Sequence, residues 1–217
     1  MNRRKFLHLG ALTAPLLAAR KTYANGFDKT TKPIVVSTWD SGMPVNAEAW
    51  KVLSANGRAL DAVEAGARHM EDKIDCCVGL GANPDRDGIV TLDSCIMDDK
   101  SNCGAVAALE RIKHPVSVAR MVMEKTPHVL LAGAGAQQFA IANGFPLEKQ
   151  ELSEPAKKEY ENWLKKSEYK PVINIENQKN GNGPFAPNFF ENGSPNHDTM
   201  GLVALDSSNN LSGAVTT

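Results

Sequence analysis

The sequence has almost no excess of either charge, because 24 Lys and Arg residues balance 25 Asp and Glu residues and give a formal net charge of -1. Nucleic acids and anionic membrane surfaces select proteins with a clear basic excess. The balance therefore argues against nucleic acid as a partner and indicates a small molecule instead. The 217 residues, 42% of them hydrophobic, suffice for one domain with a buried core.

Cysteine is also scarce, and its spacing does not favour a metal site. The chain contains Cys76, Cys77, Cys95 and Cys103, without the Cys-x-x-Cys pairs that zinc sites usually have. The adjacent Cys76 and Cys77 cannot easily bind one metal ion together. We expect no metal, and interpret the cysteines as small buried hydrophobes or as one disulfide in an oxidising compartment.

The apolar run near the N-terminus, residues 9–19, is too short to span a bilayer as a permanent helix. It follows adjacent arginines within residues 3–7, and small residues recur after it up to Ala24. This order is typical of an export signal, and residues 3–7 resemble a twin-arginine signal. We expect residues 1–24 to direct the protein to the periplasm, with no membrane association after export.

Hydrophobic periodicity predicts both helices and strands in the rest of the chain. Leu60, Val63, Ala67 and Met70 recur at helical spacing and predict an amphipathic helix over residues 59–71. Other helices are expected at residues 47–53 (after a turn at 42–44 and an Asn46 cap), 115–126, 134–142 and 154–166, and strands at residues 34–39, 89–92, 94–97, 103–109, 129–131 (buried), 200–205 and 211–217. Short neighbouring strands joined by turns favour an antiparallel sheet, so the fold class is α+β with helices packed on sheets.

Residues 174–195 are rich in Gly, Asn and Pro without periodicity, which predicts a long surface loop. The loop ends abruptly at His197, Asp198 and Thr199, immediately before the strand predicted at 200–205. By itself, His-Asp-Thr also fits an ordinary turn or helix cap. The tripeptide lies between a long loop and a strand. If the peptide bond between Asp198 and Thr199 were broken, the new end at Asp198 could move away with the loop while the strand held Thr199 in place.

Threonine at the start of a chain can act as a nucleophile without a separate base. Its hydroxyl is weak at neutral pH, but the α-amino group, with an ordinary pKa of about 7.7–8.0, can accept the proton. To expose this amine, the Thr199 hydroxyl would attack the Asp198 carbonyl carbon through a five-membered ring. The resulting ester would then be hydrolysed by water, and a strained backbone at that bond would favour the attack.

The sequence around this junction closely resembles the glycosylasparaginases, a family of N-terminal-nucleophile threonine amidohydrolases. The similar stretches include His-Asp-Thr-Met-Gly at 197–201, Val-Gly-Leu-Gly at 78–81 and Pro-Asp-Arg-Asp-Gly at 84–88. Further similar stretches are residues 34–39, 46–50, 91–93, 115–127, 202–206 and 210–217. Nearly everything after the signal is covered, apart from the loop at 178–195.

The resemblance implies an αββα sandwich of the N-terminal-nucleophile hydrolase type. It implies cleavage of the side-chain amide of N-acetylglucosaminyl-asparagine, with release of aspartate and with neither metal nor organic cofactor. Residues 25–198 would form an alpha subunit and residues from Thr199 onward the beginning of a beta subunit. The two subunits would pair after cleavage, and two such pairs could form a dimer.

The resemblance also assigns roles to individual residues. Thr199 is the expected nucleophile, buried in the fold, with Asp198 before the scissile bond and His197 beside it. Thr217 matches a catalytic threonine whose hydroxyl lies near the nucleophile, although it also fits an ordinary strand threonine. Trp39 matches a tryptophan that lines the substrate pocket, although it also fits core packing.

Two departures from the family pattern stand out. Cys77 replaces a serine before Val-Gly-x-Gly, and a thiol donates a weaker hydrogen bond than a hydroxyl. The sequence also stops at Thr217, where relatives continue with the residues that bind substrate and form the oxyanion hole. We therefore expect a C-terminally truncated chain, an incomplete sandwich and little activity of this piece alone.

Other interpretations are an asparaginase or isoaspartyl peptidase of the plant type, an inactive truncated fragment, and a non-catalytic periplasmic binding protein. The first also cleaves before a threonine, although the His-Asp-Thr-Met-Gly junction favours the glycosylasparaginases. The binding protein would use Gly133 and Gly135 for phosphate. Two glycines stand there, where the phosphate-binding pattern has three.

Overall fold

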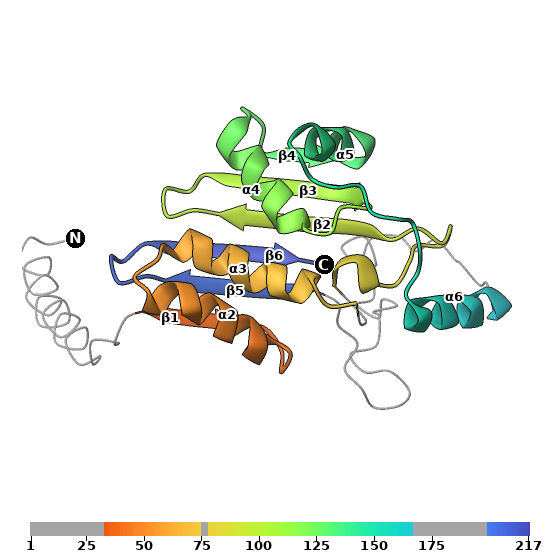
Figure 1. Ribbon diagram of the computed structural model, residues 1–217, viewed down its shortest axis with the longest axis horizontal. Coiled ribbons are helices and arrows are strands. Elements are labelled where there is room, and N and C mark those ends of the chain that lie inside the picture. The colour runs from red at the N-terminus through yellow and green to blue at the C-terminus, as the bar shows by residue number, and fades with distance from the viewer. Residues whose placement is uncertain (1–32, 75–77, 167–198) are drawn as a thin grey trace, which may run out of the picture. The chain divides into compact units, whose positions relative to one another are not determined.

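The computed structural model describes residues 33–74, 78–166 and 199–217, which build a six-stranded sheet with helices packed against it (Figure 1). The strands are β1 (Ile34–Ser37), β2 (Thr91–Met97), β3 (Cys103–Glu110), β4 (Leu130–Ala132), β5 (Met200–Leu205) and β6 (Leu211–Thr216). The helices are α2 (Gly42–Ser54), α3 (Ala59–Glu71), the short 3-10 helix η1 (Gly79–Gly81), α4 (Pro115–Lys125), α5 (Gly133–Ala142) and α6 (Glu154–Lys166).

The sheet brings the end of the described chain next to its beginning. Its strand order is β1-β5-β6-β2-β3-β4, so the β5–β6 hairpin lies between β1 and β2. All neighbouring strands are antiparallel except β3 and β4, which are parallel. In the hairpin, Met200 pairs with Thr216 and Leu205 with Leu211. A strand far along the sequence thereby becomes central in the sheet.

Helices α2, α3 and α4 cover one face of the sheet (Figure 1). The predicted helix over residues 59–71 is confirmed, and its apolar positions are buried in the core. Its first amide, that of Ala59, donates a 3.1 Å hydrogen bond to the Asp206 Oδ2 beyond the end of β5. A helix start leaves amide groups without partners inside the helix, so the hairpin turn supplies one acceptor for α3.

The opposite face of the sheet carries apolar side chains that the described residues do not cover. The exposed fraction is 56% at Val36, 48% at Val203, 38% at Val215 and 47% at Met97. Side chains alternate between the two faces of a strand, so the residues between these exposed positions point toward the helices.

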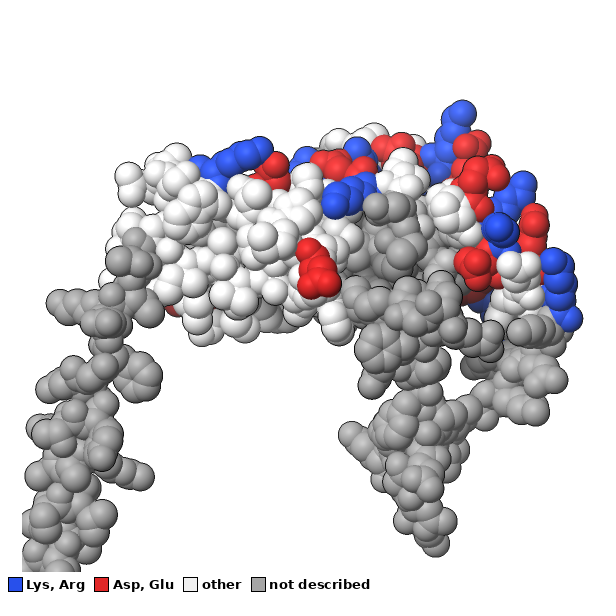
Figure 2. Space-filling view, turned by 90° about the horizontal axis from the view of Figure 1, so that it is seen from below, with Lys and Arg blue, Asp and Glu red and all other residues white. Residues whose placement is uncertain are grey.

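The charged residues are unevenly distributed over the surface. In Figure 2 they gather along one margin and one end, while the opposite margin is mainly uncharged. The described residues thus form one sheet and one helical layer of the expected αββα arrangement.

Several elements have the bounds predicted from the sequence, notably α3, α6 and β5. None of the helices in residues 33–74, 78–166 and 199–217 combines the length and the apolar character that a membrane-spanning helix needs. The predicted loop at 174–195 and the signal at 1–24 lie outside the described residues.

Three predictions were wrong in detail. The two strands expected at 89–92 and 94–97 form the single strand β2, with a register shift between Leu92 and Ser94. The turn expected at 42–44 is instead the first turn of α2, so Asn46, which was expected to cap this helix, lies inside it. The strand at 129–131 is not buried, because Leu130 in β4 remains 53% exposed at the end of the strand order.

Candidate active site

Thr199 and Thr217 lie opposite each other at one end of the β5–β6 hairpin, one position beyond the Met200–Thr216 pair. Thr199 immediately precedes β5, and Thr217 immediately follows β6. Because Met200 pairs with Thr216 in an antiparallel hairpin, the next position outward brings Thr199 and Thr217 together. The hairpin therefore joins the two threonines that the sequence resemblance singled out.

The main chain of Thr199 is held by Trp39, which lies two residues beyond β1. The Trp39 indole Nε1 donates a 2.9 Å hydrogen bond to the Thr199 carbonyl oxygen. Trp39 has a φ of +63°, a left-handed conformation that is costly for a bulky residue. The surrounding backbone must therefore hold Trp39 in place, and its indole reaches Thr199 as a result.

Thr38 adds two more links across this end of the sheet. Its amide donates to the Gly201 carbonyl oxygen at 2.9 Å, and its Oγ1 accepts the Gly201 amide at 3.1 Å. The β1–β5 pairing thus continues past Ser37, the last residue of β1. These bonds fix the start of β5 and hence the position of Thr199.

A bulge in β2 holds Thr217. The Thr217 amide donates to the Asp93 carbonyl oxygen at 3.0 Å, and the Asp93 Oδ1 accepts the Ala108 amide at 2.7 Å. Asp93 lies at the register shift, and Ala108 has a φ of +48°. Bulges of this kind redirect side chains and recur beside active sites.

The exposure of two site residues bears on what the sequence led us to expect. Thr199 was expected to be buried but is exposed among the described residues, because it lies beyond the paired part of β5. Trp39 is 51% exposed, which excludes the alternative that it packs in the core. Its role in lining the substrate pocket stays a prediction. His197, Asp198 and Cys77 lie outside the described residues.

Sequence reasoning overlooked three residues that support this end of the sheet: Thr38, Ala108 and Glu71. Glu71 had a detectable signal, since it lies one helical turn after Ala67 and therefore on the apolar face of α3. A carboxyl group at that position must be buried with polar partners. Nothing in the local sequence marked the bulge at Asp93 or the backbone conformation of Ala108.

The cysteines in the described part offer no competing nucleophile. Cys95 and Cys103 are free, and burial raises the pKa of the Cys95 thiol, with neighbouring Cys103 adding to the rise. The reactive form of cysteine is the thiolate, so a raised pKa makes Cys95 less reactive. Among residues 33–74, 78–166 and 199–217, no three His, Cys, Asp or Glu side chains gather in a way that could hold a metal ion.

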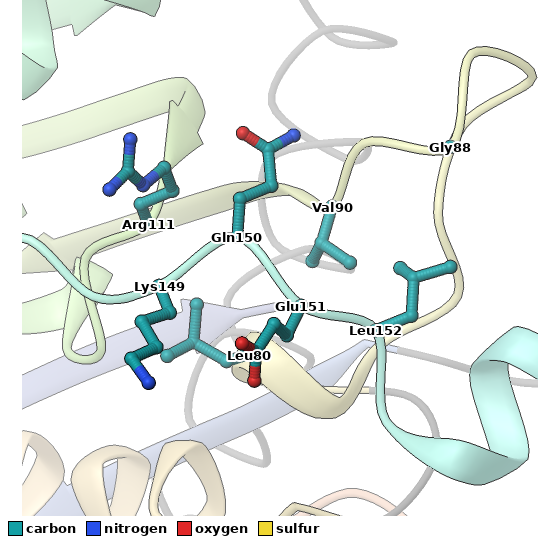
Figure 3. A pocket seen from close by; sticks show the side chains of 8 residues that line it. All are labelled: Leu80, Gly88, Val90, Arg111, Lys149, Gln150, Glu151 and Leu152. Atoms are coloured by element: carbon teal, nitrogen blue, oxygen red, sulfur yellow. The ribbon is translucent and has the colours of Figure 1, made fainter.

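Two of the hollows in the described part are lined by residues other than the two threonines. Figure 3 shows a cavity of about 50 Å³ lined by Leu80, Gly88, Val90, Arg111, Lys149, Gln150, Glu151 and Leu152. This volume suits water rather than a sugar–amino-acid conjugate, because ligand pockets usually measure about 300–1,000 Å³. A larger hollow of about 390 Å³ lies beside the stacked rings of Tyr160 and Trp163. Thr199 and Thr217 line neither hollow.

Comparison with known proteins bears directly on this site. The chain is 51% identical to an N(4)-(β-N-acetylglucosaminyl)-L-asparaginase of Elizabethkingia miricola, over 100% of this chain and 60% of that protein. It is 38% identical to the mouse protein of that name, over 80% of this chain and 54% of the relative. A putative Drosophila melanogaster relative is 34% identical over 95% of this chain and 58% of its own length. The chain thus spans at most 60% of these relatives.

The family comparison covers all of the described residues. A family model described as asparaginase matches residues 28–217, from before β1 to the end of the sequence. The match includes Trp39, Thr199 and Thr217, the residues that meet at one end of the sheet. It confirms the family resemblance predicted from the junction motifs. The chain therefore belongs to the asparaginase family.

Proposed function

We propose that the full-length protein is an amidohydrolase that cleaves the side-chain amide of N-acetylglucosaminyl-asparagine and releases aspartate. The observation that carries this proposal is the register of the β5–β6 hairpin, which brings Thr199 next to Thr217. Trp39 supports it, because its indole holds the Thr199 carbonyl group. The relative with 51% identity bears the name of this activity and covers the whole chain.

The first step of the proposed mechanism is self-cleavage between Asp198 and Thr199. The Thr199 hydroxyl attacks the Asp198 carbonyl carbon, and the peptide C–N bond breaks as the amine takes up a proton. Water then hydrolyses the ester, which leaves a carboxyl group on Asp198 and a free α-amino group on Thr199. This amine is the base that the threonine hydroxyl lacks in the uncleaved chain.

The second step acts on the substrate. The Thr199 hydroxyl gives its proton to its own α-amino group and attacks the β-carbonyl carbon of the glycosylated asparagine. The C–N bond breaks, the glycosylamine leaves with a proton, and an aspartyl ester remains on Thr199. Water hydrolyses this ester and releases aspartate. The Thr217 hydroxyl, at the neighbouring register position, can donate a hydrogen bond that adjusts the nucleophile.

The proposal needs no metal or organic cofactor, since nucleophile and base belong to one residue. It includes pairing of an alpha subunit ending at Asp198 with a beta subunit beginning at Thr199, and a possible dimer of such pairs. We also propose export to the periplasm, supported by the basic and apolar order of residues 1–24.

The test is a comparison of substrates with the purified full-length gene product after self-cleavage. We expect hydrolysis of N-acetylglucosaminyl-asparagine with a higher kcat/KM than hydrolysis of free asparagine or of β-aspartyl dipeptides. Aspartate release, measured by a coupled assay, gives all three rates. A preference for β-aspartyl dipeptides would favour the isoaspartyl peptidase alternative, and a preference for free asparagine would favour an asparaginase.

A further inference from the structure

Glu71, the last residue of α3, has a side chain with no exposed surface. Its Oε1 accepts hydrogen bonds from the Thr216 hydroxyl at 2.6 Å and from the Val116 amide at 3.1 Å. Its Oε2 lies 3.3 Å from the His114 Nδ1. Burial of a carboxyl group is costly unless it has polar partners, so these contacts account for its place in the core.

These contacts join three elements at one point. Glu71 ends α3, Val116 lies in the first turn of α4, and Thr216 is the last residue of β6. Thr216 is fully buried, so its hydroxyl group cannot hydrogen-bond to solvent water in place of the Glu71 carboxyl group. The backbone of Gly79 lies close as well, since a Cβ built there would be 3.0 Å from the Glu71 carbonyl oxygen. The end of β6 is thus tied to a crowded junction of helices.

Thr216 connects this junction to the threonine pair. It faces Met200 in the hairpin and immediately precedes Thr217. Side chains alternate along a strand, so Thr216 points toward the helices while the next residue turns to the other face. Glu71 therefore does not reach Thr217 but fixes the residue from which Thr217 projects.

We propose that Glu71 is a positioning residue for both self-cleavage and hydrolysis. Its bond to Thr216 sets the end of β6, and this sets the Thr217 hydroxyl against Thr199. The inference rests on the proposed function, in which Thr199 is the nucleophile. Small displacements of catalytic groups cost large factors in rate, so loss of this bond reduces rate rather than substrate affinity.

Three variants of the full-length gene product test the proposal. Thr216→Val has nearly the same shape but cannot donate to Glu71, and Thr216→Ser keeps the hydroxyl. Ser212→Ala is the matched control, because Ser212 lies on the same face of β6 and its buried hydroxyl has no hydrogen-bond partner among the described residues. Each variant is measured for thermal unfolding, for self-cleavage by intact mass, and for kcat and KM per cleaved molecule.

We expect Thr216→Val to slow self-cleavage and to lower kcat by about ten- to a hundredfold, with KM changed less than about threefold. Thr216→Ser should restore most of both rates, and Ser212→Ala should match the wild type. The inference is overturned if Thr216→Val lowers only the unfolding temperature while both rates stay at the Ser212→Ala level.

The two measured reactions separate this inference from the proposed function. Self-cleavage needs no added substrate, so it reports the position of Thr199 and Thr217 whatever conjugate the enzyme prefers. A wild-type protein that cleaves itself but does not hydrolyse N-acetylglucosaminyl-asparagine would overturn the proposed substrate. The effect of Thr216→Val on self-cleavage would still decide the role of Glu71.

Discussion

The indole nitrogen of Trp39 donates a hydrogen bond to the main-chain oxygen of Thr199, across 160 positions of sequence. This bond acts on the backbone of the proposed nucleophile. Trp39→Phe keeps an aromatic ring and requires the same left-handed backbone conformation, but it removes the hydrogen-bond donor. We expect self-cleavage and kcat to fall between about threefold and tenfold, the equivalent of one neutral hydrogen bond.

The measurement for Trp39→Phe is the half-time of self-cleavage by intact mass, followed by kcat of the cleaved protein. Trp50→Phe, a change at a 46% exposed tryptophan on α2, is the control and should leave both rates unchanged. Equal rates for the two variants would show that the indole donor does not contribute.

Replacement of Thr199 tests the chemistry of the proposed nucleophile. We expect Thr199→Ala to remain a single chain without hydrolytic activity, because no hydroxyl is left to attack either carbonyl carbon. Thr199→Ser should still split, at a reduced rate, since it retains a hydroxyl without the methyl group that restricts its rotamer. Intact mass over days distinguishes the outcomes, and two fragments from Thr199→Ala would refute self-cleavage by this residue.

Asp206 should make stability depend on acid. Burial alone would raise the pKa of its carboxyl group, but hydrogen bonds from Asn210, Ala59 and Ser208 hold the pKa below its ordinary value of 3.8. A lowered folded-state pKa stabilises the fold above the ordinary pKa, and this contribution is lost as the pH falls through the folded value. We expect Asp206→Asn to lower the free energy of unfolding by about 2 kcal/mol at neutral pH.

The pH profile of Asp206→Asn gives the sharper check. Its deficit relative to wild type should be constant between about pH 5 and 8 and should shrink below the ordinary pKa. Asp87→Asn, at a side chain with 68% exposure, should change the free energy of unfolding by less than about 0.5 kcal/mol. A deficit that stays the same in acid would mean that the charge of Asp206 contributes nothing.

Replacement of glycine by alanine should have opposite effects on stability at Gly104 and at Gly135. A Cβ added at Gly104 in β3 would overlap the main-chain oxygen of Ala119 in α4, so the helix could not remain against the strand. We expect Gly104→Ala to destabilise the fold by about 3 kcal/mol. Gly135→Ala on α5 meets no atom within 4 Å and should stabilise by about 0.5–1 kcal/mol through helix propensity.

Thermal unfolding of both glycine variants, side by side, provides the measurement. A Gly104→Ala protein as stable as the wild type would show that β3 and α4 can separate without cost. A destabilised Gly135→Ala protein would show that an additional contact forms at α5.

Local sequence patterns predicted the elements whose own residues decide their structure. Helix α3 has apolar residues at helical spacing, and β5 is a short run of mainly apolar residues before a turn, so both were predicted with the observed bounds. Pairing between distant segments decided the rest. The bulge at Asp93 depends on partners in β3 and β6, and the start of α2 at Gly42 depends on its contact with Ser37.

The candidate site also combines features that the sequence predicted with features that depend on pairing between distant segments. The resemblance at residues 197–201 singled out Thr199, but its exposure follows from where the pairing of β5 begins. Trp39 was identified by resemblance alone, because its left-handed backbone and its reach to Thr199 come from the β1–β5 contact. Glu71 could have been noticed on the apolar face of α3, but its partners lie on α4 and β6, far along the chain, so its contacts could not be predicted.

Helix α3 is tethered at both ends to one hairpin: Asp206 of the β5–β6 turn receives its first amide, and its last residue, Glu71, receives the hydroxyl of Thr216. The lengths agree, since 13 helical residues span about 20 Å and the six residues of β6 also span about 20 Å. An insertion or deletion in either element alone would pull one tether out of reach. Helix α3 and strand β6 can therefore change length only together. Natural insertions and deletions in this protein should occur in both elements or in neither.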